Sequence, residues 1–108
     1  MSSDEDDDLV YRALADGRRR RMLDLLRDAP RTTGDLVDTF AGEIDRCTVM
    51  QHIGVLERAG LVLPRREGRT RWNHLNAGPF IDIHDRWIGP YAQAATQRLA
   101  RLRAELEG

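Results

Sequence analysis

The order of apolar and polar residues in the first thirty positions predicts two amphipathic helices. The first is short, and its apolar residues pair at i, i+4 spacing: Leu9, Val10, Ala13 and Leu14. The second extends from a cap at Asp16 through Ala29 and places Met22, Leu23 and Leu26 on one face. Pro30 then ends it, because proline has no backbone N–H to donate to the preceding turn.

Two further helices with a tight turn between them are predicted over residues 32–59. Thr32 or Thr33 caps the first, which carries Leu36, Val37 and Phe40 and stops at Ala41-Gly42. Asp45 caps the second, over residues 46–59, whose inward face repeats at i, i+4, i+7: Val49, Ile53 and Leu56. Its outward face is mainly polar, with long side chains, and carries Arg46, Gln51, Gly54 and Arg58. This pair is typical of a helix-turn-helix.

Residues 61–75 predict a β-hairpin directly after this helix pair. Its turn lies at Glu67-Gly68, and four arginines surround the tip: Arg65, Arg66, Arg69 and Arg71. A hairpin in this place is a wing, and the combination is more specific than either part. The expected fold is therefore mainly α with a β-hairpin, a winged helix-turn-helix followed by a long C-terminal dimerisation helix.

The C-terminal third carries a second helical pattern. Pro79 opens a helix through Ile88, and Gly89-Pro90 is expected to break or kink it. Beyond that point apolar residues repeat at spacings of 3, 4, 3 and 4: Ala92, Ala95, Leu99, Leu102 and Leu106. Such a two-heptad seam favours packing on a second copy, with packing on the chain's own first helix as the alternative.

Length and composition limit the classes of protein. The 108 residues form one domain, with an acidic tail at 1–8, a winged helix-turn-helix at 9–78 and a helical dimerisation segment at 79–108. No apolar run reaches the roughly 18 residues of a membrane span, and the acidic start is unlike a signal peptide, so we expect a cytoplasmic protein that does not enter membranes. The chain has no lysine, and its serines are Ser2 and Ser3 only. No catalytic constellation remains, and an enzyme is not expected.

Charge is distributed unevenly along the chain. The net charge is −1, from 17 arginines against 18 acids, yet residues 1–8 hold five acids and no base, which predicts a disordered tail. Residues 46–71 hold six arginines and two glutamates. A local basic patch on a near-neutral chain indicates a polyanionic partner, and a solvated arginine-rich surface is the alternative.

These stretches resemble the ArsR family of winged helix-turn-helix repressors. The resemblance is carried by residues 11–16, 19–26, 33–36, 49–61 and 65–69, and it is most specific over 51–61 followed by Arg66-Glu67-Gly68-Arg69. It implies a homodimer, built through the first and last helices, that reads a near-palindromic operator in double-stranded DNA. The dimer interface is then expected at Leu9, Tyr11, Trp87, Ile88, Tyr91 and the seam from Ala92 to Leu106.

The metal sites of the family are incomplete in this chain. Where the family has Cys-x-Cys on the third helix, this chain has Thr33-Gly34-Asp35. Asp82-Ile83-His84 matches half of the zinc site on the last helix, but the other half falls on Ala95 and Arg98. Two ligands do not complete a tetrahedral site, so we expect no metal and no cofactor. The C-terminal pattern resembles the non-metal branch.

If helix 46–59 enters the major groove, its first turns face base edges. The candidate contacts are Arg46, Thr48, Met50, Gln51 and His52. Gln51 suits adenine, Arg46 suits guanine, and Met50 or the Thr48 methyl group suits a thymine methyl group. Thr48 has the alternative role of closing the first turn, and His52 that of packing under the helix. The wing arginines would contact phosphates or the minor groove. Thr32 and Thr33 would contact phosphates, with a plain helix cap as the alternative for both threonines.

Three other interpretations stay open from the sequence. The helix and wing are also compatible with a winged-helix module that binds protein. Trp87 and Tyr91 are compatible with a ligand pocket in place of a dimer interface. Cys47, the single cysteine, lies in the first turn of the helix 46–59, where the helix dipole lowers a thiol pKa. It suits either a thiol sensor or a small filler residue.

Overall fold

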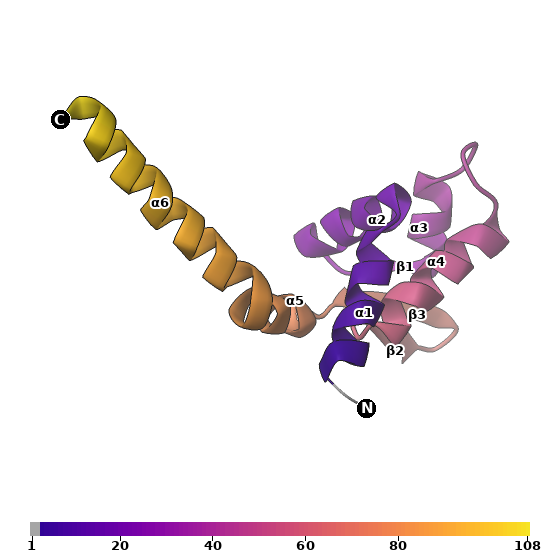
Figure 1. Cartoon of the computed structure of the whole chain (residues 1–108). Helices are drawn as coiled ribbons and strands as arrows, with labels where there is room; N and C mark the ends of the chain where they lie inside the picture. The colour runs from indigo at the N-terminus through magenta and orange to yellow at the C-terminus, as the bar shows by residue number, and fades with distance from the viewer. Residues whose placement is uncertain (1–2) are drawn as a thin grey trace.

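A computed structural model describes residues 3–108 and shows a winged helix-turn-helix body with a long helical arm (Figure 1). The elements in chain order are α1 Ser3–Leu14, α2 Gly17–Asp28, β1 Arg31–Thr32, α3 Thr33–Thr39, α4 Arg46–Arg58, β2 Val62–Glu67, β3 Thr70–Leu75, α5 Gly78–Ile83, a π-helical turn His84–Ile88 and α6 Gly89–Glu107. No helix in this described part is long and apolar enough to cross a membrane.

Side-chain caps begin three helices of the body, α2, α3 and α4, as the sequence predicts. Asp16 accepts hydrogen bonds from the backbone N–H groups of Arg18 and Arg19 at the start of α2. Thr32 caps α3 in a reciprocal capping box with Asp35. Asp45 accepts from the N–H of Thr48 at 2.7 Å and begins α4. Each cap satisfies N–H groups that have no partner within the helix, so these starting points are encoded locally.

The core lies where α1, α2, α3 and α4 meet the base of the hairpin. The predicted inward face of α4 is confirmed, because Val49, Ile53 and Leu56 are all buried. Met22 and Phe40 are fully buried as well, and the guanidinium of Arg21 lies 4.8 Å from the centre of the Phe40 ring. Burial of these side chains holds α4 against the body and fixes which of its sides faces solvent.

The sheet has three antiparallel strands in the order β1-β3-β2. The predicted hairpin is confirmed, and Gly68 at its turn has a φ of 62°, which favours glycine. β1 was not predicted, since two residues are too few to show an alternating pattern. It pairs Arg31 with Asn73 and Thr32 with Trp72, which ties the start of α3 to the wing.

Two expectations about the ends of the chain are wrong. Residues 3–8 are helical rather than a disordered tail, while Met1 and Ser2 lie outside the described residues. The acids Asp4, Glu5 and Asp6 occupy the first turn of α1, where carboxylates interact favourably with the helix dipole. Of the break or kink expected at Gly89-Pro90, the break is wrong, because the chain stays helical from the π-helical turn at His84–Ile88 into α6.

α6 extends away from the body as an isolated arm (Figure 1). None of its residues is buried, and the whole chain measures 64 × 34 × 21 Å. The radius of gyration is 18.1 Å, against about 13 Å for a compact chain of this length. Leu99, Leu102 and Leu106 are 55%, 48% and 78% exposed, so the apolar seam has no partner among residues 3–108.

Candidate nucleic-acid interface

The first turns of α4 present their outward side chains to solvent. Arg46 and Gln51 are exposed, and Met50 is 48% exposed although it is apolar. Thr48 is half-buried and hydrogen-bonds Asp45 through both its backbone and its side chain, which lowers the pKa of that carboxyl group. Arg46, Met50 and Gln51 are therefore free to meet a ligand, whereas Thr48 closes the first turn of the helix.

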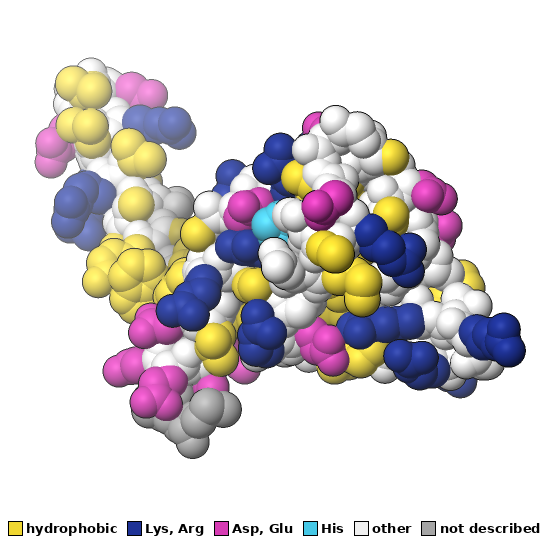
Figure 2. All heavy atoms as spheres, turned by 90° about the vertical axis from the view of Figure 1, so that its right-hand side faces the viewer, with side chains coloured by type: hydrophobic (Ala, Val, Ile, Leu, Met, Phe, Trp, Pro, Cys, Tyr) yellow, Lys and Arg dark blue, Asp and Glu magenta, His cyan; other side chains and the backbone are white. Residues whose placement is uncertain are grey.

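A groove of about 410 Å³ lies between the start of α3, the start of α4 and the wing. We call it the arginine groove, and its lining is Thr32, Thr33, Gly34, Arg46, Met50, Arg66, Arg69, Thr70 and Arg71. Figure 2 shows one face of the molecule, with basic side chains gathered toward the lower right and acidic ones crowded at the lower left, where α1 begins. The groove thus brings Arg46 of α4 together with the wing arginines, which lie about twenty residues away in sequence.

Arg71 differs from the other wing arginines, because the protein itself holds its guanidinium. Its Nη2 donates to Oε2 of Glu57 on α4 at 2.8 Å, and its Nε donates to Oδ1 of Asn73 at 3.3 Å. The Arg71 side chain is 26% exposed. Sequence reasoning placed Arg71 with the free phosphate contacts and did not single out Glu57, since the ion pair exists only once the hairpin folds back on α4.

Asn73 is the fully buried polar residue of the core and was also not singled out. Its amide Nδ2 donates to the carbonyl oxygen of Arg31 and to Oγ1 of Thr33, both at 3.2 Å. The Thr33 hydroxyl therefore binds Asn73, and Thr32 rather than Thr33 caps α3. Thr33 has a structural role in place of the phosphate contact expected from the sequence. Glu57, Arg71, Asn73 and Thr33 together connect α4, the wing and the start of α3. This network therefore fixes the positions of the three elements that line the arginine groove relative to one another.

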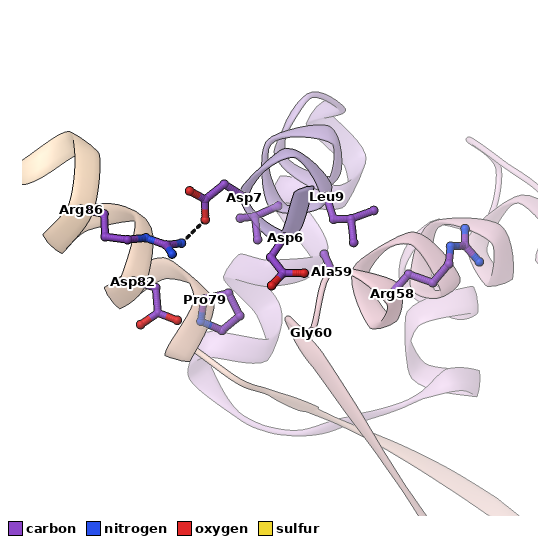
Figure 3. Close-up of a pocket in the computed structure, with 10 residues that line it drawn as sticks. Asp6, Asp7, Leu9, Arg58, Ala59, Gly60, Pro79, Asp82 and Arg86 are labelled. Carbon is purple, nitrogen blue, oxygen red and sulfur yellow. Dashed lines mark hydrogen bonds and ion pairs between the residues drawn. The ribbon is translucent and has the colours of Figure 1, made fainter. Parts of the chain in front are cut away.

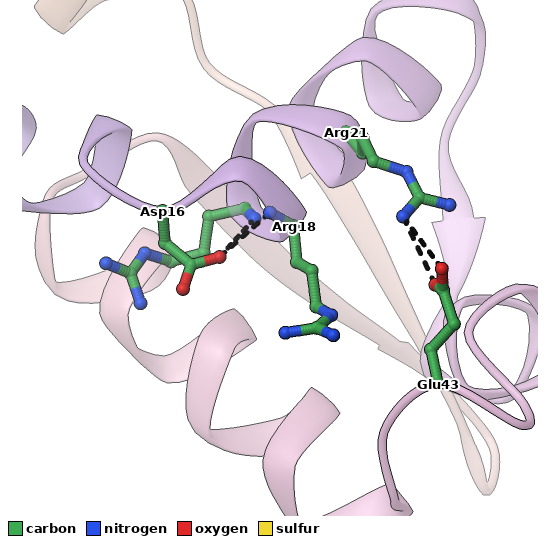
Figure 4. Close-up of polar contacts among 5 residues, drawn as sticks. Asp16, Arg18, Arg21 and Glu43 are labelled. Atoms are coloured by element: carbon green, nitrogen blue, oxygen red, sulfur yellow. Dashed lines mark hydrogen bonds and ion pairs between the residues drawn. The ribbon is translucent and has the colours of Figure 1, made fainter.

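His52 turns from α4 toward the body rather than outward. Its Nδ1 lies 3.1 Å from Nη1 of Arg19, which also donates to the carbonyl oxygens of Ala13 and Arg12 at the end of α1. Figure 4 shows Asp16 at the start of α2, bonded to the N–H of Arg18, and the separate Arg21–Glu43 pair. The Arg19 guanidinium can only donate hydrogen bonds, so Nδ1 of His52 must accept, and the His52 ring is then neutral. Of the two roles weighed for His52, packing under the helix agrees with these contacts.

Partial burial lowers the pKa of His52, the Asp16 carboxylate raises it, and Arg19 and Arg18 lower it, with a net decrease. The pKa of Asp16 is also decreased overall: burial raises it, but hydrogen bonds from the N–H groups of Arg19 and Arg18, with the nearby charges of His52 and Arg19, outweigh burial. The cluster therefore favours neutral His52 beside an ionised Asp16.

A pH effect on stability follows from His52. Its pKa is lower in the folded protein, so the unfolded chain takes up the proton first, and stability is lost as the pH falls below about 6.5. Between ~pH 7.5 and ~pH 5.5, we expect urea unfolding to show a larger loss of free energy for the wild type than for His52→Gln. His84→Gln is the control, because His84 is exposed. Equal losses in the wild type and His52→Gln would contradict the assignment.

The residues expected at a dimer interface lie at the junction of body and arm. The rings of Tyr11 and Trp87 meet edge to face with centroids 6.2 Å apart, and Trp87 and Tyr91 are 5.3 Å apart. Trp87, Ile88 and Tyr91 are 56%, 45% and 66% exposed. Ala92 and Ala95 are exposed on α6. Leu9 is different, since it packs partly buried against the core of its own chain.

A second pocket, of about 300 Å³, lies between α1, the end of α4 and α5 (Figure 3). Asp6, Asp7, Asp82, Arg58 and Arg86 supply its charges, and Arg86 pairs with Asp7. Asp82, one of the two residues that match the zinc site of the family, thus lines this pocket. The other, His84, has its Nδ1 at 3.5 Å from Oδ1 of Asp85. Within residues 3–108, no group of three His, Cys, Asp or Glu side chains is placed to hold a metal ion. Cys47 is exposed at the start of α4.

Comparison with known proteins gives consistent matches. Residues 14–65 match the family described as a helix-turn-helix domain. The chain is 33% identical over 86 residues to the uncharacterized HTH-type transcriptional regulator YuzN of Bacillus subtilis, covering 75% of this chain and 94% of YuzN. It is 31% identical over 67 residues to the transcriptional repressor SdpR of Bacillus subtilis, covering 62% of this chain and 72% of SdpR.

The fold also matches solved structures. The crystal structure of the ArsR family transcriptional regulator RHA00566 superposes with a TM-score of 0.77 at 26% identity, covering 88% of this chain and 95% of that chain. YuzN, SdpR and RHA00566 are each named as regulators of transcription.

Proposed function

Because the chain belongs to the ArsR family of helix-turn-helix transcriptional regulators, we propose that it is a repressor that binds a near-palindromic DNA operator as a homodimer. In this proposal α4 lies in the major groove, and the wing follows the sugar-phosphate backbone or the adjacent minor groove. DNA binding and regulation follow from the family. The sequence-specific contacts, the dimer and the repression are the proposed parts.

The observation that carries the proposal is the arginine groove beside the exposed first turns of α4. Arg46, Arg66 and Arg69 line one concave surface, and Arg65 extends the basic charge along the wing. Guanidinium groups bind phosphate oxygens through two parallel hydrogen bonds, so this surface suits a DNA backbone. The α4 side chains that can reach base edges are Arg46, Met50 and Gln51. Arg71 is assigned to holding the wing against Glu57 rather than to a phosphate.

The unpartnered arm supports the homodimer. α6 presents an exposed apolar seam of Leu99, Leu102 and Leu106, which no other part of the described chain covers, and the exposed rings of Trp87 and Tyr91 lie at the start of the arm. A large exposed apolar surface at heptad spacing is stable when a second copy buries it. A symmetric pair of bodies would present two α4 helices to one duplex, which accounts for a near-palindromic operator.

The direct test is fluorescence anisotropy with DNA taken from immediately upstream of the gene, against a scrambled duplex, at two salt concentrations. We expect tight binding that prefers the upstream DNA and weakens as salt rises, because phosphate contacts release counterions. Sedimentation of the complex would give two chains per duplex. No preference at either salt concentration would contradict an operator-binding repressor and favour a winged-helix module that binds protein.

Arg69→Ala and Gln51→Ala are expected to separate the two kinds of DNA contact. Loss of Arg69 removes a phosphate contact, so binding to specific and scrambled DNA should weaken by a similar factor and the salt slope should fall by about 1. Loss of Gln51 removes a base contact worth about 1–3 kcal/mol, so operator binding alone should weaken, by roughly 5- to 150-fold. Equal losses on both duplexes for both variants would contradict this division of roles.

A further inference from the structure

Few contacts hold the junction between body and arm, and those contacts determine the direction of α6. No residue of α6 is buried, and the arm reaches the body through the π-helical turn His84–Ile88. The direction of the whole arm is therefore set at this turn and at the face of α1 beside it. The junction is also where the exposed aromatic residues gather.

Two side-chain contacts fasten the turn to α1. Arg86 forms an ion pair with Asp7 (Figure 3). The Asp7 side chain is only 19% exposed. One helical turn further along α1, Tyr11 meets the edge of Trp87. Asp7 and Tyr11 are four residues apart and share a face of α1, while Arg86 and Trp87 are adjacent in the turn. The ionic and aromatic contacts thus act together as a two-point clamp, which we call the junction clamp.

The backbone of the turn requires glycine at position 89. The N–H of Gly89 donates to the carbonyl oxygen of His84, five residues earlier, which defines the π-helical turn. A Cβ atom on residue 89 would lie 2.7 Å from that same carbonyl oxygen, closer than real Cβ contacts come. Pro90 follows and has no N–H to offer to the preceding turn. The clamp and this backbone together permit one direction of the arm.

The direction of the arm has a large effect at its far end. The 19 residues of α6 span about 28 Å at ~1.5 Å per residue. A rotation of about 10° at the junction would move the end of the helix by roughly 5 Å over that length. Successive base pairs of DNA are about 3.4 Å apart. A small change at the junction therefore shifts a body by more than one base pair relative to its partner.

We propose that the junction clamp, Asp7–Arg86 and Tyr11–Trp87, with Gly89, sets the distance between the two α4 helices of the dimer and so selects the spacing of the two operator half-sites. These residues determine specificity by positioning and touch no base. The inference rests on the proposed function, since it requires a homodimer that binds a two-part operator.

Cys47 allows this distance to be measured without DNA. It is the single cysteine of the chain, it is exposed, and it lies in the first turn of α4, so a nitroxide label on each copy reports the separation of the two helices. Pulsed electron spin resonance on the wild-type dimer should give one narrow distance distribution. Arg86→Gln and Asp7→Asn should broaden or shift it, and the reversed pair Asp7→Arg with Arg86→Asp should restore a single narrow distribution.

Asp8→Asn is the matched control, because it removes the same charge from the exposed neighbour of Asp7. It should leave the distribution unchanged. Gly89→Ala tests the backbone independently of the ion pair and should also move or broaden the distribution. Circular dichroism and sedimentation establish that each variant is folded and dimeric before the distances are compared.

Unlabelled protein then tests half-site spacing on duplexes that differ by one base pair between the half-sites. Wild type should discriminate by about tenfold between its preferred spacing and neighbouring ones, and the clamp variants by about twofold, with affinity for a single half-site unchanged. Unchanged distances and spacing preference in Arg86→Gln, Asp7→Asn and Gly89→Ala would overturn the inference while leaving the repressor proposal intact. A monomeric wild type, or one that binds no half-site, would overturn both.

Discussion

Leu99→Glu with Leu102→Glu is expected to leave the protein monomeric and to weaken operator binding by more than about 100-fold. Both leucines lie on the exposed seam of α6, at 55% and 48% exposure in the single chain, and a dimer would bury them. Burying four carboxylates across a symmetric seam is strongly unfavourable, because charges lose their hydration there and repel one another. Once the two bodies are separated, each half-site must be bound independently. Sedimentation equilibrium and anisotropy with the operator measure the two effects.

The control for this pair adds the same charge to the other side of the arm. Gln97→Glu with Ala104→Glu places two carboxylates outside the heptad seam, on exposed positions of the same helix. Dimerisation and operator affinity should then stay within about threefold of the wild type, apart from a general electrostatic effect on DNA binding. A seam variant that remains dimeric would show that α6 is not the contact between the two copies.

Phe40→Ala is expected to lower the free energy of unfolding by about 3–5 kcal/mol. Phe40 is fully buried where α3 ends, and the Arg21 guanidinium packs over its ring. Its removal leaves a cavity under the turn that leads into α4, and also takes away the cation–π contact. A domain of this size has a total stability of only about 5–15 kcal/mol, so this loss would be a large part of the total.

Urea denaturation at one fixed protein concentration measures this change, since a dimer's stability depends on concentration. Leu63→Ala is the matched control, because Leu63 is 51% exposed on β2 and should change the free energy by about 0.5 kcal/mol or less. A loss below about 1 kcal/mol for Phe40→Ala would contradict the burial of this ring in the core that supports the helix-turn-helix.

The parts of the fold that depend on nearby residues could be predicted from the sequence. Asp45 and the spacing of Val49, Ile53 and Leu56 determine both the start of α4 and the side it buries, because capping and helical periodicity act over a few residues. The hairpin follows in the same way from the glycine at its turn. The same reasoning predicts the exposed outer face of α4 and the basic wing, which together supply most of the arginine groove.

The features that were missed depend on contacts between residues far apart in sequence. β1 exists because Arg31 and Thr32 reach the outer side of β3, and a two-residue strand has no pattern of its own. The pairing of Arg71 with Glu57 depends on how the wing packs on α4, so the side chain first expected at a phosphate is held inside the protein. Asn73, a polar residue at an inward-facing strand position, is a sequence signal that could have indicated this network but was not used.

The π-helical turn also sets the rotational phase of the arm. Each residue of an α-helix turns the chain by about 100°, so one residue added to or removed from His84–Ile88 would carry Leu99 and Leu102 roughly a quarter of the way around the helix axis. The side of α6 that a partner meets is thus encoded in the number of residues in this turn as well as in their identity. Among relatives with arms of equal apolar content, the residue count between the body and the arm would decide which arms are able to pair.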